Sequence, residues 1–332
     1  MASVSEMLRK IRVTPLAAES LGVRSMCTYV ETPDVRILLD AGVSLAPNRF
    51  GFPPHPKEYL ALAECRRKIA EAAEKAEIVT ISHYHFDHHT PSFTDWCFNW
   101  SSQEVADQIY AEKHVLAKNY KENINFSQRR RGWIFAKTSG KQAKKLEYVD
   151  SKTFTFDDTK VKFSDPVFHG PPNSHLGWLL MATIECDNEK LVFASDVQGP
   201  MHDVTFKKIM DEKPHLLLIG GPPSYLAEFR FKQELIDFAL KSLETIVKHV
   251  PMTILEHHLL RDEQWKTQAR PIFRAALEAK NYVVTAAEFL GKENNLLEAK
   301  RRELFEKNPP DREFEKWMKL PLPKRKLTKP PL

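Results

Sequence analysis

Short apolar runs separated by turn residues occupy the first forty positions of the chain. These runs cover 11–15, 25–32 and 35–39, and β-prone runs bounded by glycine, proline and aspartate are typical of strands. The stretch 56–76 has apolar residues three and four positions apart among charged ones, which predicts an amphipathic helix. The largely apolar run 78–81 that follows predicts a buried strand.

The same kind of pattern resumes after position 150, with short apolar runs separated by longer amphipathic stretches. The expected strands are 153–156, 160–163, 178–185, 190–194, 216–219, 253–255 and 282–286, and the expected helices are 229–249, 263–280 and a last one from 293. Strands in two batches with helices between them predict an α/β fold in which helices cover two sheets.

Two stretches of the chain are basic. Residues 101–147 hold 10 lysines and arginines against 5 acidic residues, including the arginines at 129–131 beside Trp133. We expect this stretch to be a basic helical insertion or a lid. Residues 299–332 hold 11 basic against 5 acidic residues and end in a Pro-rich tail, 320–332, which we expect to be extended or disordered. Such stretches can face RNA or DNA, although a solvated surface also explains them.

The composition excludes several classes of protein. With 332 residues and 42% hydrophobic residues, the chain can bury a full core and is not a disordered chain. No apolar run approaches the ~20 residues needed to cross a bilayer, and the opening segment has no apolar run behind its basic residues. We therefore expect a cytoplasmic protein without membrane contacts. The four cysteines are far apart and form no CxxC pair, which argues against a disulfide framework.

The sequence SHYHFDHH directly follows the apolar run 78–81. It places His83, His85, Asp87 and His88 within six positions, and neutral imidazoles and carboxylates are good ligands for zinc and similar divalent ions. Alternate residues of an extended turn project the same way, so His83 and His85 can face one ion. Asp87 and His88 lie on the following turn and can face a second ion. A solvated polar loop is the alternative interpretation.

This HxHxDH motif resembles the central motif of the metallo-β-lactamase superfamily, and further motifs follow in the family's order. Asp40 in ILLDAG resembles the aspartate that supports the metal loop. His169, Asp196 and His257, each after an apolar run, resemble the later ligand positions. The resemblance spans 11–289 and is closest to an uncharacterised archaeal group within the superfamily. It implies an α/β four-layer αββα sandwich of two mixed sheets with outer helices.

The resemblance also implies how the chain is divided and what it binds. Residues 1–292 would form the catalytic domain, 293–319 a helical extension and 320–332 the basic tail. Two divalent metal ions are implied, Zn²⁺ first, with Fe or Mn as alternatives. In the family pattern the first ion is held by His83, His85 and His169, the second by Asp87, His88 and His257, and Asp196 bridges the two. A metal-bridging hydroxide would be the nucleophile, which makes Asp87 and Asp196 the catalytic carboxylates, Asp87 as a ligand more than as a general base.

Two ligand positions stay open at this point. His169 and His175 both lie in the third-motif loop, and His169 is favoured because it ends its strand directly. His257 and His258 compete for the last position; EHHLLR resembles a nuclease-branch pattern that favours His257 and makes Arg261 the arginine of that pattern. His175, His258 and Arg261 are then candidate substrate contacts, and a surface position explains Arg261 equally well.

The function implied by the resemblance is metal-dependent hydrolysis. Phosphodiesters of RNA or DNA are the favoured substrates, because of the two basic stretches and the nuclease-like EHHLLR motif. Hydrolysis of lactam, lactone or ester bonds, in a β-lactamase-like or promiscuous enzyme, is the alternative. A non-catalytic nucleic-acid-binding scaffold is a third hypothesis, but it predicts lost ligands, whereas every metal position is filled.

Overall fold

The computed structural model describes residues 8–172 and 174–332, so the first seven residues of the opening segment considered above lie outside the described residues. One sheet of six strands is built from the first half of the chain. Its strands are, in spatial order, β1 (Arg12–Pro15), β2 (Thr28–Glu31), β3 (Arg36–Leu39), β4 (Ile78–Ile81), β5 (His114–Ala117) and β6 (Lys145–Tyr148). The first three pair antiparallel and β3 to β6 pair parallel, so the sheet is mixed.

A second mixed sheet of seven strands is built from the other half. Its order is β15 (Tyr282–Val284), β14 (Met252–Glu256), β13 (Leu216–Gly220), β12 (Glu189–Ala194), β11 (Ala182–Cys186), β8 (Thr159–Phe163) and β7 (Thr153–Phe156). Strands β12 to β15 run parallel, whereas β12, β11, β8 and β7 pair antiparallel. A separate pair, β9 (Val167–Phe168) and β10 (Trp178–Leu179), brackets the loop that carries His169.

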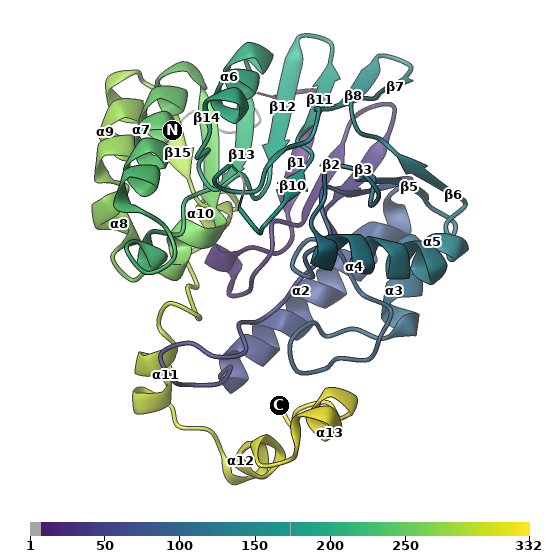
Figure 1. The fold of residues 1–332 in the computed structure, drawn as a ribbon, viewed down its shortest axis with the longest axis vertical. Helices are drawn as coiled ribbons and strands as arrows, with labels where there is room; N and C mark the ends of the chain where they lie inside the picture. The colour runs from purple at the N-terminus through teal and green to yellow at the C-terminus, as the bar shows by residue number, and fades with distance from the viewer. Residues whose placement is uncertain (1–7, 173) are drawn as a thin grey trace.

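Helices lie on the outer side of each sheet (Figure 1). The first sheet is flanked by α2 (Pro56–Lys75), α3 (Gln103–Tyr110), α4 (Phe126–Lys137) and α5 (Ser139–Gln142). The second is flanked by α6 (Asp203–Glu212), α7 (Gln233–His249), α8 (Trp265–Gln268) and α9 (Arg270–Glu278). After α10 (Ala286–Phe289) the chain descends through α11 (Arg301–Lys307), α12 (Arg312–Met318) and α13 (Leu322–Leu327), at the bottom of Figure 1. Three short 3₁₀ turns are η1 (Glu19–Leu21), η2 (Ser224–Leu226) and η3 (His257–Arg261).

Buried apolar residues form three separate contact layers. One layer packs α2 and α3 against the first sheet, through residues such as Leu62, Ile69 and Val79. A second joins the two sheets face to face, as where Ile37 and Ile184 belong to one cluster. The third packs α7 and α9 against the second sheet. Three apolar layers between four structural layers make an αββα sandwich, which confirms the fold expected from the sequence.

Helix α2 has the sequence features that start and stabilise a helix, which is why it was predicted well. Pro56 occupies the first turn, where a missing N–H costs nothing, and His55 and Glu58 form a reciprocal cap. One face of the helix is buried while its other face carries charges, as the three- and four-residue spacing requires.

The interpretation of 101–147 as an insertion or lid needs correction. This stretch contains β5 and β6, which pair parallel with β4 and complete the first sheet. The stretch is therefore a structural part of the sandwich. The helices expected within it are present as α3, α4 and α5. The two strands were missed because HVLA and KLEY are only four residues long and carry charged or polar residues at their starts.

The carboxyl-terminal region also differs from expectation. The stretch 293–300 precedes the first helix of the extension, which begins at Arg301. The tail expected to be extended or disordered forms α13, where Lys326 pairs with Asp95 at 3.1 Å and its carbonyl oxygen accepts from Trp96 N. The side chain of Lys326 in the basic tail therefore has a partner within the chain itself.

Two expectations about chemistry and environment can be compared directly with the structure. All four cysteines are buried and unpaired, in agreement with the absence of a disulfide framework. Across the described residues, none of the helices combines the length and the apolarity that crossing a membrane requires.

Candidate metal centre

The side chains of the five motifs gather at one edge of the two sheets. Asp40 directly follows β3 and His83 comes two positions after the end of β4. His169 directly follows β9, Asp196 comes two positions after β12, and His257 directly follows β14. Because the carboxyl ends of parallel strands meet at one edge of a sheet, ligands commonly bind there. The two sheets present these edges to each other.

His83, His85, His169 and Asp196 form one group, with one ligand-type atom from each lying within 4.8 Å of the others. Nε2 of His83 is 3.2 Å from Nδ1 of His85, and Nε2 of His169 is 2.6 Å from Oδ2 of Asp196. The structure thus brings together the four residues that the resemblance assigned to one ion and the bridging position.

Asp87, His88 and His257 form a second group of the same kind. Oδ2 of Asp196 lies 3.3 Å from Nε2 of His257 and 3.9 Å from Nε2 of His88. Asp196 therefore stands between the two groups, where a carboxylate shared by two ions would have to be.

Two buried carboxylates fix the tautomers of the second group. Nδ1 of His88 lies 2.9 Å from Oδ2 of Asp40, and Nδ1 of His257 lies 3.1 Å from Oε2 of Glu19. If each Nδ1–H donates to its carboxylate, both Nε2 atoms keep a lone pair, and they face each other at 3.3 Å. Such a pair of acceptors fits a cation between them, and histidines that bind metals usually donate their second ring N–H in this way.

Burial and charge favour the metal-binding protonation state of His83 and of Asp196. Burial and the neighbouring imidazoles, that of His88 foremost, hold the pKa of His83 well below its ordinary value, which keeps the ring neutral. Burial by itself would raise the pKa of Asp196, but the imidazoles of His169 and His257 outweigh burial and hold that pKa well below its ordinary value. The site therefore offers a neutral imidazole at His83 and an ionised carboxylate at Asp196, the protonation states that divalent ions require. His257 differs, because the carboxylates of Glu19 and Asp196 outweigh burial and raise the pKa of its ring to about 10, so an ion bound there would have to displace a proton.

The backbone of the site is strained at three places. Asp40, Gln198 and His257 have φ values of 47°, 58° and 67°, in the left-handed region that costs most residues energy and is concentrated at functional sites. Gly42 passes so close to the metal loop that a Cβ there would lie 2.4 Å from His88 N. The loop after β3 is therefore fitted closely to the loop that carries the HxHxDH motif.

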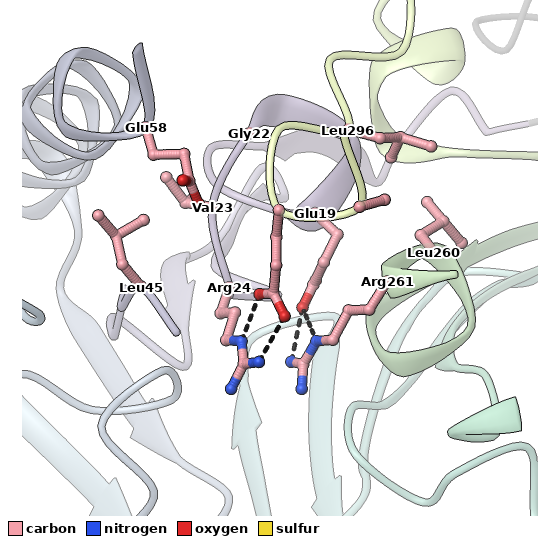
Figure 2. Close-up of a pocket in the computed structure, with 11 residues that line it drawn as sticks. Glu19, Gly22, Val23, Arg24, Leu45, Glu58, Leu260, Arg261 and Leu296 are labelled. Carbon is pink, nitrogen blue, oxygen red and sulfur yellow. Dashed lines mark hydrogen bonds and ion pairs between the residues drawn. The ribbon is translucent and has the colours of Figure 1, made fainter. Parts of the chain in front are cut away.

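Two ion pairs lie side by side, that of the buried Arg261 and that of the partly buried Arg24 (Figure 2). The Arg261 guanidinium donates from Nε and Nη2 to Oε1 of Glu19 at 2.8 and 2.6 Å. Arg24 donates from Nε and Nη2 to the two oxygens of Glu298, both at 2.6 Å. Glu19 thus contacts both Arg261 and His257, and it connects the ion pair to the metal centre.

The structure separates His169 from His175, but it brings both His257 and His258 to Asp196, in a further group of ligand-type atoms. His169 lies in the first group, whereas the exposed His175 lies on the cleft wall outside both groups. His257 joins Asp87 and His88, while Nε2 of His258 approaches the other oxygen of Asp196 at 3.3 Å from the cleft side. Arg261 is buried and is 3.7 Å from Oδ2 of Asp87, so it is not the surface residue of the alternative interpretation.

The metal centre forms the floor of a cleft of about 890 Å³. The acidic residues that line it are Asp87 and Asp196, and both belong to the metal centre. The basic residues that line it are Arg24, Arg49, Arg230, Lys232 and Arg261, of which Arg24 and Arg261 are neutralised by their buried partners. The wall of the cleft is therefore positively charged.

Neither basic stretch singled out in the sequence contributes to this cleft. Its lining includes no residue from 101–147 or 299–332. Arg131 instead donates to the carbonyl oxygen of Tyr84 and stacks over Phe86, 4.4 Å from the ring centroid. The charged residues that do line it, such as Arg49 and Arg230, had no local signal in the sequence, because each is a single cation in a loop.

Glu19 and Gln198 are two residues of the site that the motifs did not include. Glu19 lies in a short turn far from every motif, and only the folded chain brings it to His257. Gln198 lies two positions after Asp196, with Nε2 3.4 Å from Nδ1 of His169. Its position close to a motif aspartate could have identified Gln198 as a residue of the site, although an amide is not a typical metal ligand.

Two mixed sheets between helical layers, with this set of side chains at one edge of both, agree with the architecture that the resemblance to the metallo-β-lactamase superfamily implied. A UPF0282 protein of Methanopyrus kandleri is 44% identical over 294 residues, which cover 89% of this chain and 99% of that protein. A UPF0282 protein of Korarchaeum cryptofilum is 38% identical over 308 residues, which cover 92% of this chain and 99% of that protein. The chain belongs to the UPF0282 family of archaeal proteins.

Other comparisons give weaker likenesses. No family model matches the chain. Among solved structures, a mutant of the CmlA beta-hydroxylase aligns with 84% of this chain and 52% of its own length, at 12% identity and a TM-score of 0.49. A metal-dependent hydrolase of the beta-lactamase superfamily aligns with 83% of this chain and 95% of its own length, at 11% identity and a TM-score of 0.45.

Proposed function

We propose that this protein is a metal-dependent hydrolase with two divalent ions, most simply Zn²⁺. The observation that carries the proposal is that two groups of ligand-type side chains converge on Asp196 at the floor of one cleft. His83, His85 and His169 would hold one ion, Asp87, His88 and His257 the other, and Asp196 both. Together these ions would supply an activated water and polarise the bond to be broken.

The chain's own residues have separable roles in this proposal. Asp40 and Glu19 orient His88 and His257 by accepting their Nδ1 protons. On the cleft side, Nδ1 of His258 lies 2.9 Å from Nη1 of Arg261 and 3.5 Å from the Tyr225 hydroxyl. This second layer holds His258 beside Asp196, where its ring can contact a bound substrate.

Phosphodiesters, as in RNA or DNA, are the substrate class that we propose. The charge of the cleft supports this choice, because Arg49, Arg230 and Lys232 line it while its two acidic residues belong to the metal centre. Arginine matches phosphate oxygens with its planar fork of donors. Neutral lactones and esters have no anionic group for these cations to bind.

The test combines metal content with a parallel substrate panel. Purified protein should contain about two equivalents of zinc, iron or manganese, one for each group of ligands, and should hydrolyse bis-p-nitrophenyl phosphate or labelled RNA faster than a lactone or nitrocefin. His85→Ala should remove both metal and activity, whereas His249→Ala, a change of an exposed histidine on α7, should change neither. Activity that persists in metal-free His85→Ala protein would exclude the hydrolase proposal. Turnover of nitrocefin alone would exclude the phosphodiester preference.

A further inference from the structure

Arg49 is a cleft-lining arginine that, unlike Arg24 and Arg261, has no acidic partner among the described residues. Its Nη2 donates to the carbonyl oxygen of Arg261 at 2.9 Å. Its other contacts in the described part of the chain are two aromatic rings, those of Phe50 and Tyr225, at 4.5 and 4.2 Å from the guanidinium carbon. None of these partners neutralises the charge, in contrast to the buried carboxylates that pair with Arg24 and Arg261.

The guanidinium of Arg49 is held in place although it is not neutralised. The two rings restrict its plane, and aromatic stacking of this kind suits arginine. The backbone of Arg49 is fixed by reciprocal hydrogen bonds with Phe52, both at 2.9 Å. The carbonyl oxygen of Phe52 in turn accepts from the buried Arg301 at 3.1 Å. Arg49 therefore keeps its position without a ligand, so little entropy is lost when a ligand binds.

The Arg49 guanidinium still has N–H groups that can donate hydrogen bonds to a ligand. A guanidinium has five N–H groups, and the Arg261 carbonyl oxygen uses one. Within the described residues the buried Nε of Arg49 has no hydrogen-bond partner, and an unpaired donor of a charged group is costly. The donors left for a ligand are therefore those of the two terminal nitrogens that the Arg261 carbonyl oxygen does not use. A planar group with free donors on one edge matches the oxygens of a phosphate.

The position of Arg49 relative to the metal centre is set by Tyr225. The ring that stacks on Arg49 carries a hydroxyl 3.5 Å from Nδ1 of His258, and Nε2 of His258 is 3.3 Å from Asp196. Arg49 is thus separated from the bridging aspartate by two side chains along the same cleft wall. A group bound by Arg49 would therefore lie next to the bond that is hydrolysed, and it would not contact the metal ions.

We propose that Arg49 forms a phosphate subsite that binds a second phosphate of the substrate, adjacent to the one that is hydrolysed. This inference rests on the proposed phosphodiesterase function and narrows it to substrates with consecutive phosphates, such as an oligonucleotide. An isolated phosphodiester would reach the ions but leave Arg49 without an acceptor.

Equilibrium binding tests the subsite without requiring turnover. Binding of uridine 3′,5′-bisphosphate to the metal-loaded protein is compared by calorimetry with binding of uridine 3′-monophosphate and uridine 5′-monophosphate. The second phosphate should tighten binding to wild-type protein by about tenfold or more, the size expected of a hydrogen bond to a charged group. Arg49→Gln should lose this gain while its affinity for the tighter-binding monophosphate changes little.

Arg302→Gln is the matched control. Arg302 also stacks on Phe50, 5.1 Å from the ring centroid, but is exposed and does not line the cleft. The variant removes the same charge next to the same ring and should keep the full gain. Arg49→Lys, which retains the charge but loses the planar fork, should give a gain between those of wild type and Arg49→Gln, and it replaces Arg49→Gln if that variant fails to fold.

The outcomes separate the subsite from the function on which it rests. A gain that is absent in wild-type protein, or that persists in both Arg49 variants, overturns the subsite even if phosphodiesters are hydrolysed. A gain that depends on Arg49 in a protein that hydrolyses no phosphodiester supports the phosphate subsite and counts against the proposed reaction.

Discussion

Glu19 and His257 are 238 positions apart in the chain, yet Oε2 of Glu19 lies 3.1 Å from Nδ1 of His257. Glu19 belongs to the turn η1 and His257 directly follows β14, so the contact joins the first half of the molecule to the second. Through this contact Nε2 of His257 is directed at Asp87 and Asp196, at 3.7 and 3.3 Å. Glu19 is therefore a positioning residue for the metal centre.

Replacement of Glu19 should weaken metal binding. In Glu19→Gln the amide no longer attracts the Nδ1 proton as a carboxylate does, and loss of such an orienting partner typically lowers metal affinity by about 10–100-fold. Competition with a chelator measures the affinity. Glu298→Gln, which alters the neighbouring ion pair with Arg24 but does not contact His257, should keep wild-type affinity. Equal losses in the two variants would show that the effect comes from general destabilisation.

Gly42→Ala should disturb the loop that carries the metal ligands. A Cβ at this position would lie 2.3 Å from His89 N and 2.4 Å from His88 N, and these are backbone atoms that cannot move without the loop. We expect clearly reduced metal affinity together with a lower melting temperature. Gly51→Ala meets no atom within 4 Å but has a positive φ, so it should cost about 1–2 kcal/mol of stability and leave the affinity unchanged. Wild-type affinity in Gly42→Ala would contradict the close fit of the two loops.

Arg66→Met should destabilise the first half of the sandwich. The buried Arg66 guanidinium donates to the carbonyl oxygen of Asn99 at 2.8 Å and to Thr90 Oγ1 at 2.5 Å. Its loss leaves buried acceptors unsatisfied, at roughly 1–3 kcal/mol each. Arg67→Met is the control, because this neighbour on α2 pairs with Glu64 on the surface and exposed pairs contribute about 0–1 kcal/mol. Denaturant unfolding measures both, and equal effects would refute the structural role of Arg66.

The pair between Arg24 and Glu298 should make stability depend on acid pH. Burial by itself would raise the pKa of Glu298, but the charge and hydrogen bonds of Arg24 lower it from 4.5 to about 2. A carboxyl with a lowered folded-state pKa contributes stability above its unfolded pKa and loses it as the pH falls through the folded one. The free energy of unfolding should therefore fall between pH 4.5 and about pH 2, by on the order of 3 kcal/mol from this group.

Glu298→Gln isolates that contribution from those of other carboxylates. The variant should be less stable than wild type at neutral pH, and the difference between the two should shrink across the same pH window. Urea titrations at several pH values give both free energies. A difference that stays constant between pH 4.5 and pH 2 would mean that Glu298 is not held ionised by Arg24.

Much of the secondary structure could be predicted from the sequence, because it follows from the spacing of apolar residues within each segment. The run 78–81 was placed as a buried strand and is β4, and the spacing of apolar residues in 56–76 predicted α2 almost to its ends. The sequence pattern did not predict β5 and β6, because both are short strands that begin with a polar residue. Their stretch was therefore expected to be helical. Only pairing with β4 in the parallel sheet makes strands of them.

The sequence by itself determined which side chains can bind metal, because the spacing of His83 to His88 and the order of the later motifs need no distant partner. The tertiary structure decided that His169 rather than His175 joins them, that Glu19 orients His257, and that Arg49 rather than the arginines at 129–131 lines the cleft. Motif spacing records neighbours along the chain. The contact between Glu19 and His257 joins residues 238 positions apart, so it forms only when the two sheets pack against each other. The burial of apolar residues, which is not directional, brings the two sheets together.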